Sequence, residues 1–563
     1  MIYHCEDHTC NYWDEGEKLP ERCPQCGRKL LRANEADMTG DDWTALGNTL
    51  WDAEASDKKR MVDCFRKAAY LGSAWGVCNL GICMEQGNGV EADPVQAFWL
   101  YQQAVEMGSL NAVCCLGVCY EYGIGTAPDA KQAAELYCKA AEYGSPRGQM
   151  LLAHAFHDGI GVEADAAEAV HWVRAAAYQR YGEGMYWLGV CYEYGDGVEQ
   201  NWEHAVHWFR EAAESGVSAA MTDLGWCYEK GCGVEQSWEQ AFSWYRRGAE
   251  CGYPVSMSNL GLCYKRGYGV EQNWQEAVKW YEQGAQCGNL QSMNNLAYCY
   301  EYGEGVEQNE ERALYWYRRG AEAGSDYCMY CLGWNYSNGE GVEQNMTEAI
   351  RWYTAAAEGG NADAMHDLGW LYDHGEGVEQ DMKKAICWYE RAAEQNCPAA
   401  MNSLGECYAM GRGVPRDLET AMEWYRRAAE LGEAMADYNM GWHLEQAGKL
   451  SEAYAHYRKA ADGNDDSAWW ALGRFYENGV VVAQDGKEAR RCYETGEKLG
   501  SVKCKMRLAR CKLLGIGGRR AKKAGLDLCR QALELAKESS EKEDYGYEAE
   551  MNLLRRTIAE NES

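Results

Sequence analysis

The sequence predicts an all-α fold: a right-handed α-α superhelical solenoid of about 13 helical hairpins, preceded by a small N-terminal zinc ribbon. Three observations predict the solenoid. A glycine pair recurs every 36 residues, a Leu-Gly pair precedes it at a constant distance, and an alanine follows it at a constant distance. A fixed period of this length is typical of repeat proteins, in which each unit buries its apolar face against its neighbours.

The glycine pairs have the form Gly-x-Gly and keep one register over ten copies. They stand at Gly87/Gly89, Gly123/Gly125, Gly159/Gly161, Gly195/Gly197, Gly231/Gly233, Gly267/Gly269, Gly303/Gly305, Gly339/Gly341, Gly375/Gly377 and Gly411/Gly413. The Leu of the Leu-Gly pair comes seven residues earlier, as at Leu224, with Leu-Ala instead at Leu152-Ala153 and Leu296-Ala297. The alanine comes ten residues after the first glycine, as at Ala241. Ten copies in phase indicate one structural unit used repeatedly.

Each unit has the pattern of two short helices. In residues 219–230, Ala220, Leu224 and Tyr228 fall on one helical stripe, and Gly231 ends the helix because glycine accepts the left-handed conformation. In residues 238–251, a second stripe is led by Ala241. A hairpin of two such helices cannot bury its own apolar face, so stacked copies must do so.

Composition excludes several classes of function. The 563 residues contain 55 Lys+Arg and 87 Asp+Glu, a net charge of −32, which disfavours a nucleic-acid binder because phosphate recognition uses clustered basic residues. The apolar runs are about half of the ~20 residues that a membrane span needs. The first residues lack the basic and apolar regions of a secretory signal, and the 27 cysteines suit a reducing compartment. We therefore expect a cytoplasmic protein that contacts no membrane.

The repeat resembles the Sel-one-like repeat (SLR) family, which is related to the tetratricopeptide repeats. The resemblance is carried by Leu-Gly-x-Cys-Tyr-x-x-Gly-x-Gly-Val-Glu-Gln-Asn followed by Ala-x-x-Trp-Tyr-x-x-Ala-Ala-Glu-x-Gly, of which residues 188–216 are a close copy. It implies a solenoid over 41–518, with regular units at about 74–432 and degenerate units on either side, and capping helices over 519–563. It also implies an adaptor that assembles other proteins, because most members of the family act in this way.

Four cysteines before the repeats have the spacing of a zinc site. Cys5 and Cys10 are followed by Cys23 and Cys26 in a Cys-Pro-x-Cys-Gly knuckle, which predicts a zinc ribbon over residues 1–30 and a linker over 31–40. His4 or His8 could replace one thiolate, because the first pair departs from the commoner Cys-x-x-Cys spacing. Four such ligands leave no open position, so the zinc is expected to be structural.

The cysteines of the repeats are predicted to be buried thiols. Those that follow the Leu-Gly pair by two positions, such as Cys83 and Cys227, have no partner cysteine at a constant offset in the second helix. A cysteine-rich branch of the resembled family does carry a disulfide in each repeat, and β-lactam hydrolysis has been attributed to it. A hydrolase of that kind therefore remains the alternative function.

One histidine pair is a second candidate for chemistry. His154 and His157 lie at i and i+3 on a predicted first helix, and Glu121 and Glu193 hold the position of His157 in the neighbouring repeats. Imidazoles and carboxylates that converge could bind a metal or transfer protons. The alternative is a solvated polar patch with no ligand.

The stronger functional prediction concerns a surface, here called the first-helix face. The resemblance places the residue after each Leu-Gly pair, and the residue three positions later, on the concave side of the solenoid. The first position supplies aromatic side chains and the second supplies carboxylates, which together suit a basic peptide with apolar anchors. The predicted contact residues are Trp226, Tyr298, Trp334, Trp370, Trp442, Glu193, Glu229, Glu301 and Asp373.

These patterns favour a non-enzymatic scaffold that binds a partner protein or peptide on the first-helix face. Two alternatives stay open beside the hydrolase. The tryptophans at these positions could be ordinary packing, with carboxylates that only add solubility. The array could also be a regulatory subunit whose zinc ribbon, rather than its helices, makes the contact.

Overall fold

The computed structural model describes residues 2–5, 13–15, 30–33, 35–51, 55–542 and 548–562. Three of the predicted zinc ligands, Cys10, Cys23 and Cys26, lie outside the described residues. The backbone of Cys5 is described, at the end of a strand, and its side chain is not. The same holds for His4, and His8 lies outside the described residues, so the predicted zinc site stays a prediction.

The N-terminal region contains three short strands. They are β1 (Ile2–Cys5), β2 (Trp13–Glu15) and β3 (Leu30–Ala33), and they form an antiparallel sheet in the order β2-β1-β3. Ile2 pairs with Glu15 on one side and with Ala33 on the other. The third strand begins at the last residue of the predicted ribbon, 1–30, and continues into the predicted linker, 31–40. A one-turn helix η1 (Glu35–Asp37) follows.

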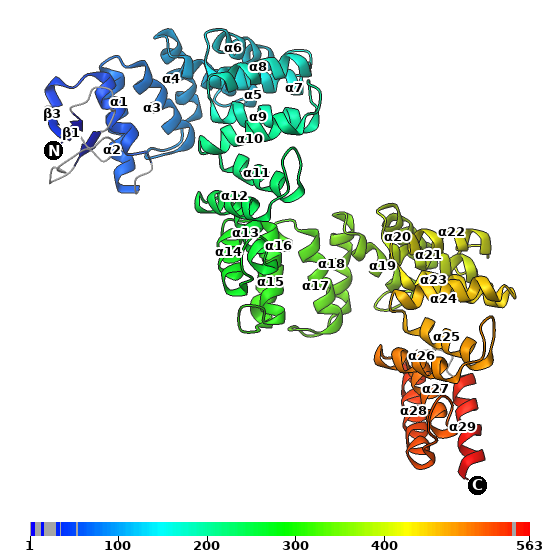
Figure 1. The fold of residues 1–563 in the computed structure, drawn as a ribbon. Helices are drawn as coiled ribbons and strands as arrows, with labels where there is room; N and C mark the ends of the chain where they lie inside the picture. The colour runs from blue at the N-terminus through cyan, green and yellow to red at the C-terminus, as the bar shows by residue number, and fades with distance from the viewer. Residues whose placement is uncertain are drawn as a thin grey trace. The chain divides into compact units, whose positions relative to one another are not determined.

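The rest of the described chain is helical (Figure 1). The helices of the first unit, residues 1–292, are α1 (Gly40–Thr49), α2 (Ala55–Tyr70), α3 (Ala74–Gln86), α4 (Pro94–Glu106), α5 (Leu110–Tyr122), α6 (Ala130–Glu142), α7 (Pro146–Asp158), α8 (Ala166–Tyr178), α9 (Gly182–Tyr194), α10 (Trp202–Glu214), α11 (Ser218–Lys230), α12 (Trp238–Glu250), α13 (Pro254–Arg266) and α14 (Trp274–Gln286). The boundary to the second unit falls within α15 (Leu290–Tyr302).

The second unit comprises residues 293–563. After α15 its helices are α16 (Glu310–Glu322), α17 (Asp326–Asn338), α18 (Met346–Glu358), α19 (Ala362–His374), α20 (Met382–Glu394), α21 (Pro398–Met410), α22 (Leu418–Glu430), α23 (Ala434–Gln446), α24 (Leu450–Asp462), α25 (Asp466–Asn478), α26 (Gly486–Lys498), α27 (Val502–Leu514), α28 (Lys522–Lys542) and α29 (Glu548–Glu562).

Odd-numbered and even-numbered helices pair as hairpins. In the described part of the chain, the 28 helices α1 to α28 form 14 pairs, beside the prediction of about 13 hairpins. The C-terminal pair is α27 with α28, a region that the sequence assigned to a degenerate last unit and a cap. The last helix, α29, packs against α27 and α28, where Met551 and Leu554 are buried with Met506 and Leu513.

Local sequence signals explain where each helix starts and stops. The Ser109 hydroxyl accepts a hydrogen bond from the Ala112 amide at the start of α5, and the Asp129 carboxylate does the same for the Gln132 amide in α6. Gly123 ends α5 in the left-handed conformation, with φ of 72°. These caps recur in most repeats, which is why most of the helices from α3 to α27 have the same length.

In six of the ten pairs, from Gly87/Gly89 to Gly267/Gly269, the second glycine lets successive hairpins bring their backbones close together. A Cβ on Gly125 would lie 2.1 Å from the Pro94 carbonyl oxygen, at the start of the second helix of the preceding hairpin. Only glycine fits such a distance, because a side chain would overlap the backbone. The Gly-x-Gly pattern therefore combines a helix stop with a contact between neighbouring repeats.

The core of most hairpins is an aromatic ring packed on a glycine. Tyr245 is 1% exposed, and its ring packs directly on Gly225 of the Leu-Gly pair. A Cβ on Gly225 would lie only 2.6 Å from the ring. Tyr101 on Gly81 and Tyr137 on Gly117 repeat this contact. The tryptophan that precedes the tyrosine lies nearer the surface, and Arg247 stacks on Trp244 with its guanidinium carbon 4.2 Å from the ring centroid.

Candidate functional site

Three exposed tryptophans mark the first-helix face in the second unit. Trp334 on α17, Trp370 on α19 and Trp442 on α23 are 45%, 40% and 38% exposed. They share one position in the repeat, the residue after the Leu-Gly pair or its Met-Gly equivalent. Trp370 stacks on His374 with ring centroids 4.2 Å apart, and this contact holds its ring against the helix. Large apolar side chains exposed at one repeated position are typical of contact surfaces.

The other two predicted anchors are less exposed. Trp226 on α11 is half-buried and lies 5.8 Å from the Trp202 ring, measured between ring centroids. Tyr298 on α15 is also half-buried and lies 4.6 Å from the Tyr302 ring. The aromatic position of the repeat is therefore not uniform, because the neighbouring side chains decide how much of each ring is covered.

The carboxylates of the first-helix face have a structural role that the sequence analysis did not identify. The buried tyrosine of the second helix donates its hydroxyl to the carboxylate on the first helix of the same hairpin. The pairs and their oxygen–oxygen distances are Tyr101–Glu85 at 2.6 Å, Tyr137–Glu121 at 2.6 Å, Tyr245–Glu229 at 2.9 Å, Tyr317–Glu301 at 2.6 Å, Tyr457–Glu445 at 2.8 Å and Tyr493–Glu477 at 2.8 Å. The sequence pattern that could have predicted these bonds is a Glu followed, in most hairpins, by a Tyr sixteen residues later.

The four predicted acidic residues differ in how far they are already engaged. Glu229 accepts the Tyr245 hydroxyl and pairs with Lys230 at 2.8 Å, and Glu301 accepts the Tyr317 hydroxyl. Asp373 is only 4% exposed and forms an ion pair with Arg412 at 3.0 Å, so burial takes it away from the surface where the sequence placed it.

Glu193 is the exception among these carboxylates. The residue that would donate to it is Phe209, which has no hydroxyl. Burial, followed by the nearby Asp223, raises the pKa of Glu193 above its ordinary value. Glu193 therefore lacks the hydroxyl that its counterparts accept from the second helix, and its tyrosine partner is Tyr194 on its own helix.

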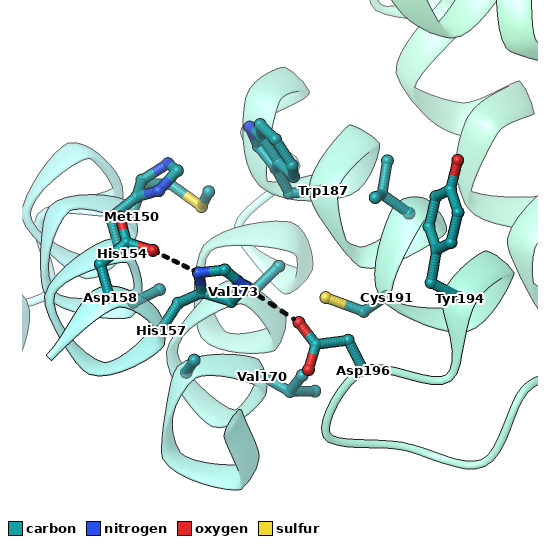
Figure 2. A pocket seen from close by; sticks show the side chains of 13 residues that line it. Met150, His154, His157, Asp158, Val170, Val173, Trp187, Cys191, Tyr194 and Asp196 are labelled. Carbon is teal, nitrogen blue, oxygen red and sulfur yellow. Dashed lines mark hydrogen bonds and ion pairs between the residues drawn. The ribbon is translucent and has the colours of Figure 1, made fainter. Parts of the chain in front are cut away.

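A cavity of about 460 Å³ lies close to Glu193 in sequence, between α7, α8 and α9 (Figure 2). We call it the α7–α9 cavity. Most of its wall is apolar. It is lined by Met150, Ala153, His154, His157, Asp158, Ala169, Val170, Val173, Trp187, Val190, Cys191, Tyr194 and Asp196. Burial raises the pKa of the Cys191 thiol to about 11, so this sulfur is protonated at neutral pH and is a poor nucleophile.

Both predicted histidines line this cavity, with different partners from those expected. Figure 2 shows the His157 ring between two carboxylates: its Nδ1 lies 2.5 Å from Asp158 Oδ1 and its Nε2 lies 3.2 Å from Asp196 Oδ2. Asp158, then Asp196, raise the pKa of His157. His154 makes an edge contact with Trp187 at 5.5 Å between centroids.

The arrangement does not form a metal centre in the described residues. No group of three or more His, Cys, Asp or Glu side chains in this part of the chain is placed to hold a metal ion. The predicted convergence of Glu121 and Glu193 on His157 is replaced by Asp158 and Asp196, because Glu121 accepts the Tyr137 hydroxyl instead. Among the same residues, no helix has the length and apolar character to cross a bilayer.

The fold and the repeated caps define a class, the α-hairpin solenoids with tandem repeats. Within it, twelve segments match the Sel1 repeat, so the chain belongs to the Sel1 repeat family. The matched residues are 76–109, 112–145, 146–181, 182–217, 218–253, 254–289, 290–325, 326–361, 362–397, 398–433, 434–465 and 468–501.

Two solved structures are similar to this chain. One is a protective antigen present in uropathogenic Escherichia coli strains, which displays an SLR fold; it is 30% identical, with 85% of this chain and 97% of that chain covered and a TM-score of 0.53. The other is a Sel1 repeat protein from Oxalobacter formigenes, which is 28% identical, with 56% and 93% covered and a TM-score of 0.43. No curated protein matches the sequence significantly.

Proposed function

We propose that the protein is a non-enzymatic scaffold that binds a partner protein or peptide on its first-helix face. The observation that carries the proposal is the exposure of Trp334, Trp370 and Trp442, between 38% and 45%, at one repeated position. Aromatic side chains that keep a large exposed area are the residues that most often dominate binding energy in protein interfaces. Membership of a repeat family whose fold offers long surfaces supports the same function.

The proposed partner is basic. The chain carries a net charge of −32. Glu229 and Glu301 stand on the first helices that carry Trp226 and Tyr298, whereas Glu193 stands on α9, where the aromatic position holds Val190. An ionised carboxylate that accepts one tyrosine hydroxyl still has free lone pairs for a Lys or Arg. Complementary charge speeds association and sets register, so we expect binding to weaken as the salt concentration rises. The many thiols favour a reducing compartment such as the cytoplasm.

The zinc ribbon is part of the same proposal. The spacing of Cys5, Cys10, Cys23 and Cys26 supports a structural zinc that would hold the segment before the solenoid. The three-stranded sheet formed by β1, β2 and β3 is compatible with a small ribbon. Zinc there would stabilise a segment too short to bury a core of its own.

The test compares capture of partners from native lysate by several forms of the full chain. We expect Trp334→Ala/Trp370→Ala to lose the partner that the wild type retains, because each lost anchor costs about 2 kcal/mol or more. The matched control is Trp99→Ala, which removes a 64% exposed tryptophan from a second helix. Equal capture by the double variant and the wild type would contradict the proposal.

A fourth bait separates the ribbon from the helices. Cys23→Ser/Cys26→Ser should abolish bound zinc, measured by elemental analysis of the purified protein, and should leave capture through the first-helix face intact. Partner loss in this variant alone would assign the contact to the ribbon and not to the tryptophans.

A further inference from the structure

The hairpin formed by α7 and α8 departs from the other repeats at three coupled positions. Most repeats place a glycine, an acidic residue and a tyrosine there, as in Gly117, Glu121 and Tyr137 of the preceding hairpin. In α7 and α8 the same positions hold Ala153, His157 and Val173. The ring, its acceptor and the glycine beneath it have therefore changed together.

The missing ring accounts for the α7–α9 cavity. Tyr137 fills the space over Gly117, and the equivalent residues Ala153 and Val173 both line the cavity. Ala153 by itself does not exclude a tyrosine, because Ala297 occupies the same position in a hairpin that keeps Tyr317 with its bond to Glu301. Val173 is therefore the residue that opens the space.

The cavity has the size and wall of a binding site. Its volume of about 460 Å³ lies within the range of about 300–1,000 Å³ that is typical of ligand pockets. Met150, Val170 and Trp187 supply apolar contact area. The polar groups gather at one side, where Asp158 and Asp196 flank His157. With His154 neutral, the two carboxylates leave this side with a net negative charge even when His157 is protonated.

We propose that the α7–α9 cavity receives a tyrosine or phenylalanine side chain of a partner peptide, with a neighbouring lysine or arginine paired to Asp158 or Asp196. The occupant follows from two observations. Other hairpins fill the equivalent space with a tyrosine ring, so the fold accepts an aromatic ring there. The acidic side complements a cation next to that ring. This proposal rests on the proposed function, because it names one contact of the same scaffold.

The experiment uses the full chain and a synthetic probe, the capped pentapeptide Gly-Lys-Tyr-Lys-Gly, titrated by calorimetry. Two control peptides replace the tyrosine by alanine or the two lysines by glutamates. We expect the tyrosine-lysine probe to bind at least about tenfold more tightly than either control, since a buried aromatic anchor and its charge partner each contribute.

Two variants test the site itself. Val173→Tyr restores the ring of the other repeats, so it should raise the melting temperature and weaken the probe by at least about tenfold. Val173→Phe is the second filling variant, and Phe209 at the equivalent position of the next hairpin shows that the fold accepts this ring. Asp158→Asn/Asp196→Asn should reduce binding of the lysine probe to the level of the glutamate control.

The outcomes separate this inference from the proposed function. If Trp334→Ala/Trp370→Ala binds the probe like the wild type and fails to capture partners, both proposals stand. If the double variant still captures partners and the probe still binds the cavity, the cavity proposal stands and the proposed role of the tryptophans is wrong. The cavity proposal is overturned if Val173→Tyr and Val173→Phe bind the probe as the wild type does, or if no binding occurs at millimolar probe. It is also overturned if uncharged p-cresol binds as tightly as the peptide and its affinity is the same in Asp158→Asn/Asp196→Asn.

Discussion

Two adjacent hairpins of the first unit, α5/α6 and α7/α8, differ in what their interiors contain. Both start their helices with Ser and Asp caps, at Ser109 and Asp129 in one and at Ser145 and Asp165 in the other. Both end their first helix at a left-handed glycine. The first hairpin encloses a tyrosine ring, and the second leaves a cavity in its place.

The comparison separates the residues that make the hairpin from those that fill it. Caps and Gly-x-Gly pairs set the helix ends and the approach of neighbouring repeats, and they are the same in both hairpins. The ring can be absent without loss of the helices, because each repeat is stabilised mainly by its neighbours. A solenoid can therefore lack the core ring in one repeat and keep its fold, and the space left by that ring becomes open to a ligand.

Removing the ring from the regular hairpin gives the largest expected effect. Tyr137→Ala deletes a side chain that is 1% exposed and packs on Gly117. We expect a loss of about 3–5 kcal/mol in the free energy of unfolding, the range for large aromatic truncations in cores. Urea denaturation followed by circular dichroism measures it.

Two control substitutions show whether the loss of stability in Tyr137→Ala comes from the buried ring. Tyr143→Ala removes a tyrosine of the same hairpin that is 68% exposed and should change stability by less than about 0.5 kcal/mol. Val173→Ala should cost less than Tyr137→Ala, because the valine already borders a cavity. Equal losses in Tyr137→Ala and Val173→Ala would show that the two interiors are not different in the way proposed.

A smaller effect is expected at the glycine beneath the ring. Gly117→Ala would place a Cβ 2.4 Å from the Tyr137 ring, so the ring must shift at a cost of about 1–3 kcal/mol. The gain in helix propensity, at most about 1 kcal/mol, offsets only part of this. We expect net destabilisation in thermal unfolding.

The reverse substitution, Ala153→Gly in the α7/α8 hairpin, is the matched control for Gly117→Ala. Ala153→Gly relieves no contact with a ring and loses helix propensity, so it should cost about 0.5–1 kcal/mol. A stabilising Gly117→Ala would mean that the ring moves freely, and the close packing of Tyr137 would then not explain the Leu-Gly pair.

Much of the fold could be predicted because its determinants are local. Gly123 and Gly125 follow the helix they end, and Asp129 precedes the helix it caps, so spacing alone locates both helices of the hairpin. The period then fixes which hairpins are neighbours. The C-terminal pair α27/α28 was predicted only as a degenerate unit and a cap, because α28 lacks the repeat pattern and is longer.

The candidate site was only partly predictable because exposure and partner choice depend on packing between repeats. His157 was found by its residue type, but its partner Asp196 lies between the glycines of a later repeat, and its side-chain direction is set by that loop. Trp226 and Trp370 hold the same position, and their exposure differs because Trp202 covers one of them. The meaning of Val173 required knowing that the tyrosine at this position fills the core.

The smallest expected effect concerns the pH dependence that His157 gives the α7/α8 hairpin. Hydrogen bonding to Asp158, with the added charge of Asp196, raises the folded-state pKa of His157 above its unfolded value. A raised pKa means that protonation favours the folded state, so this stability is present at pH values below the unfolded pKa of about 6.5 and is lost as the pH rises through the folded pKa. Because the imidazole is 56% exposed, solvent screening keeps the effect small.

The melting temperature of the wild type should therefore exceed that of His157→Gln more at pH 5.5 than at pH 8.5. His171→Gln is the matched control, because it removes an exposed histidine from α8. A difference that grows towards high pH would show that the pairing with Asp158 and Asp196 does not form.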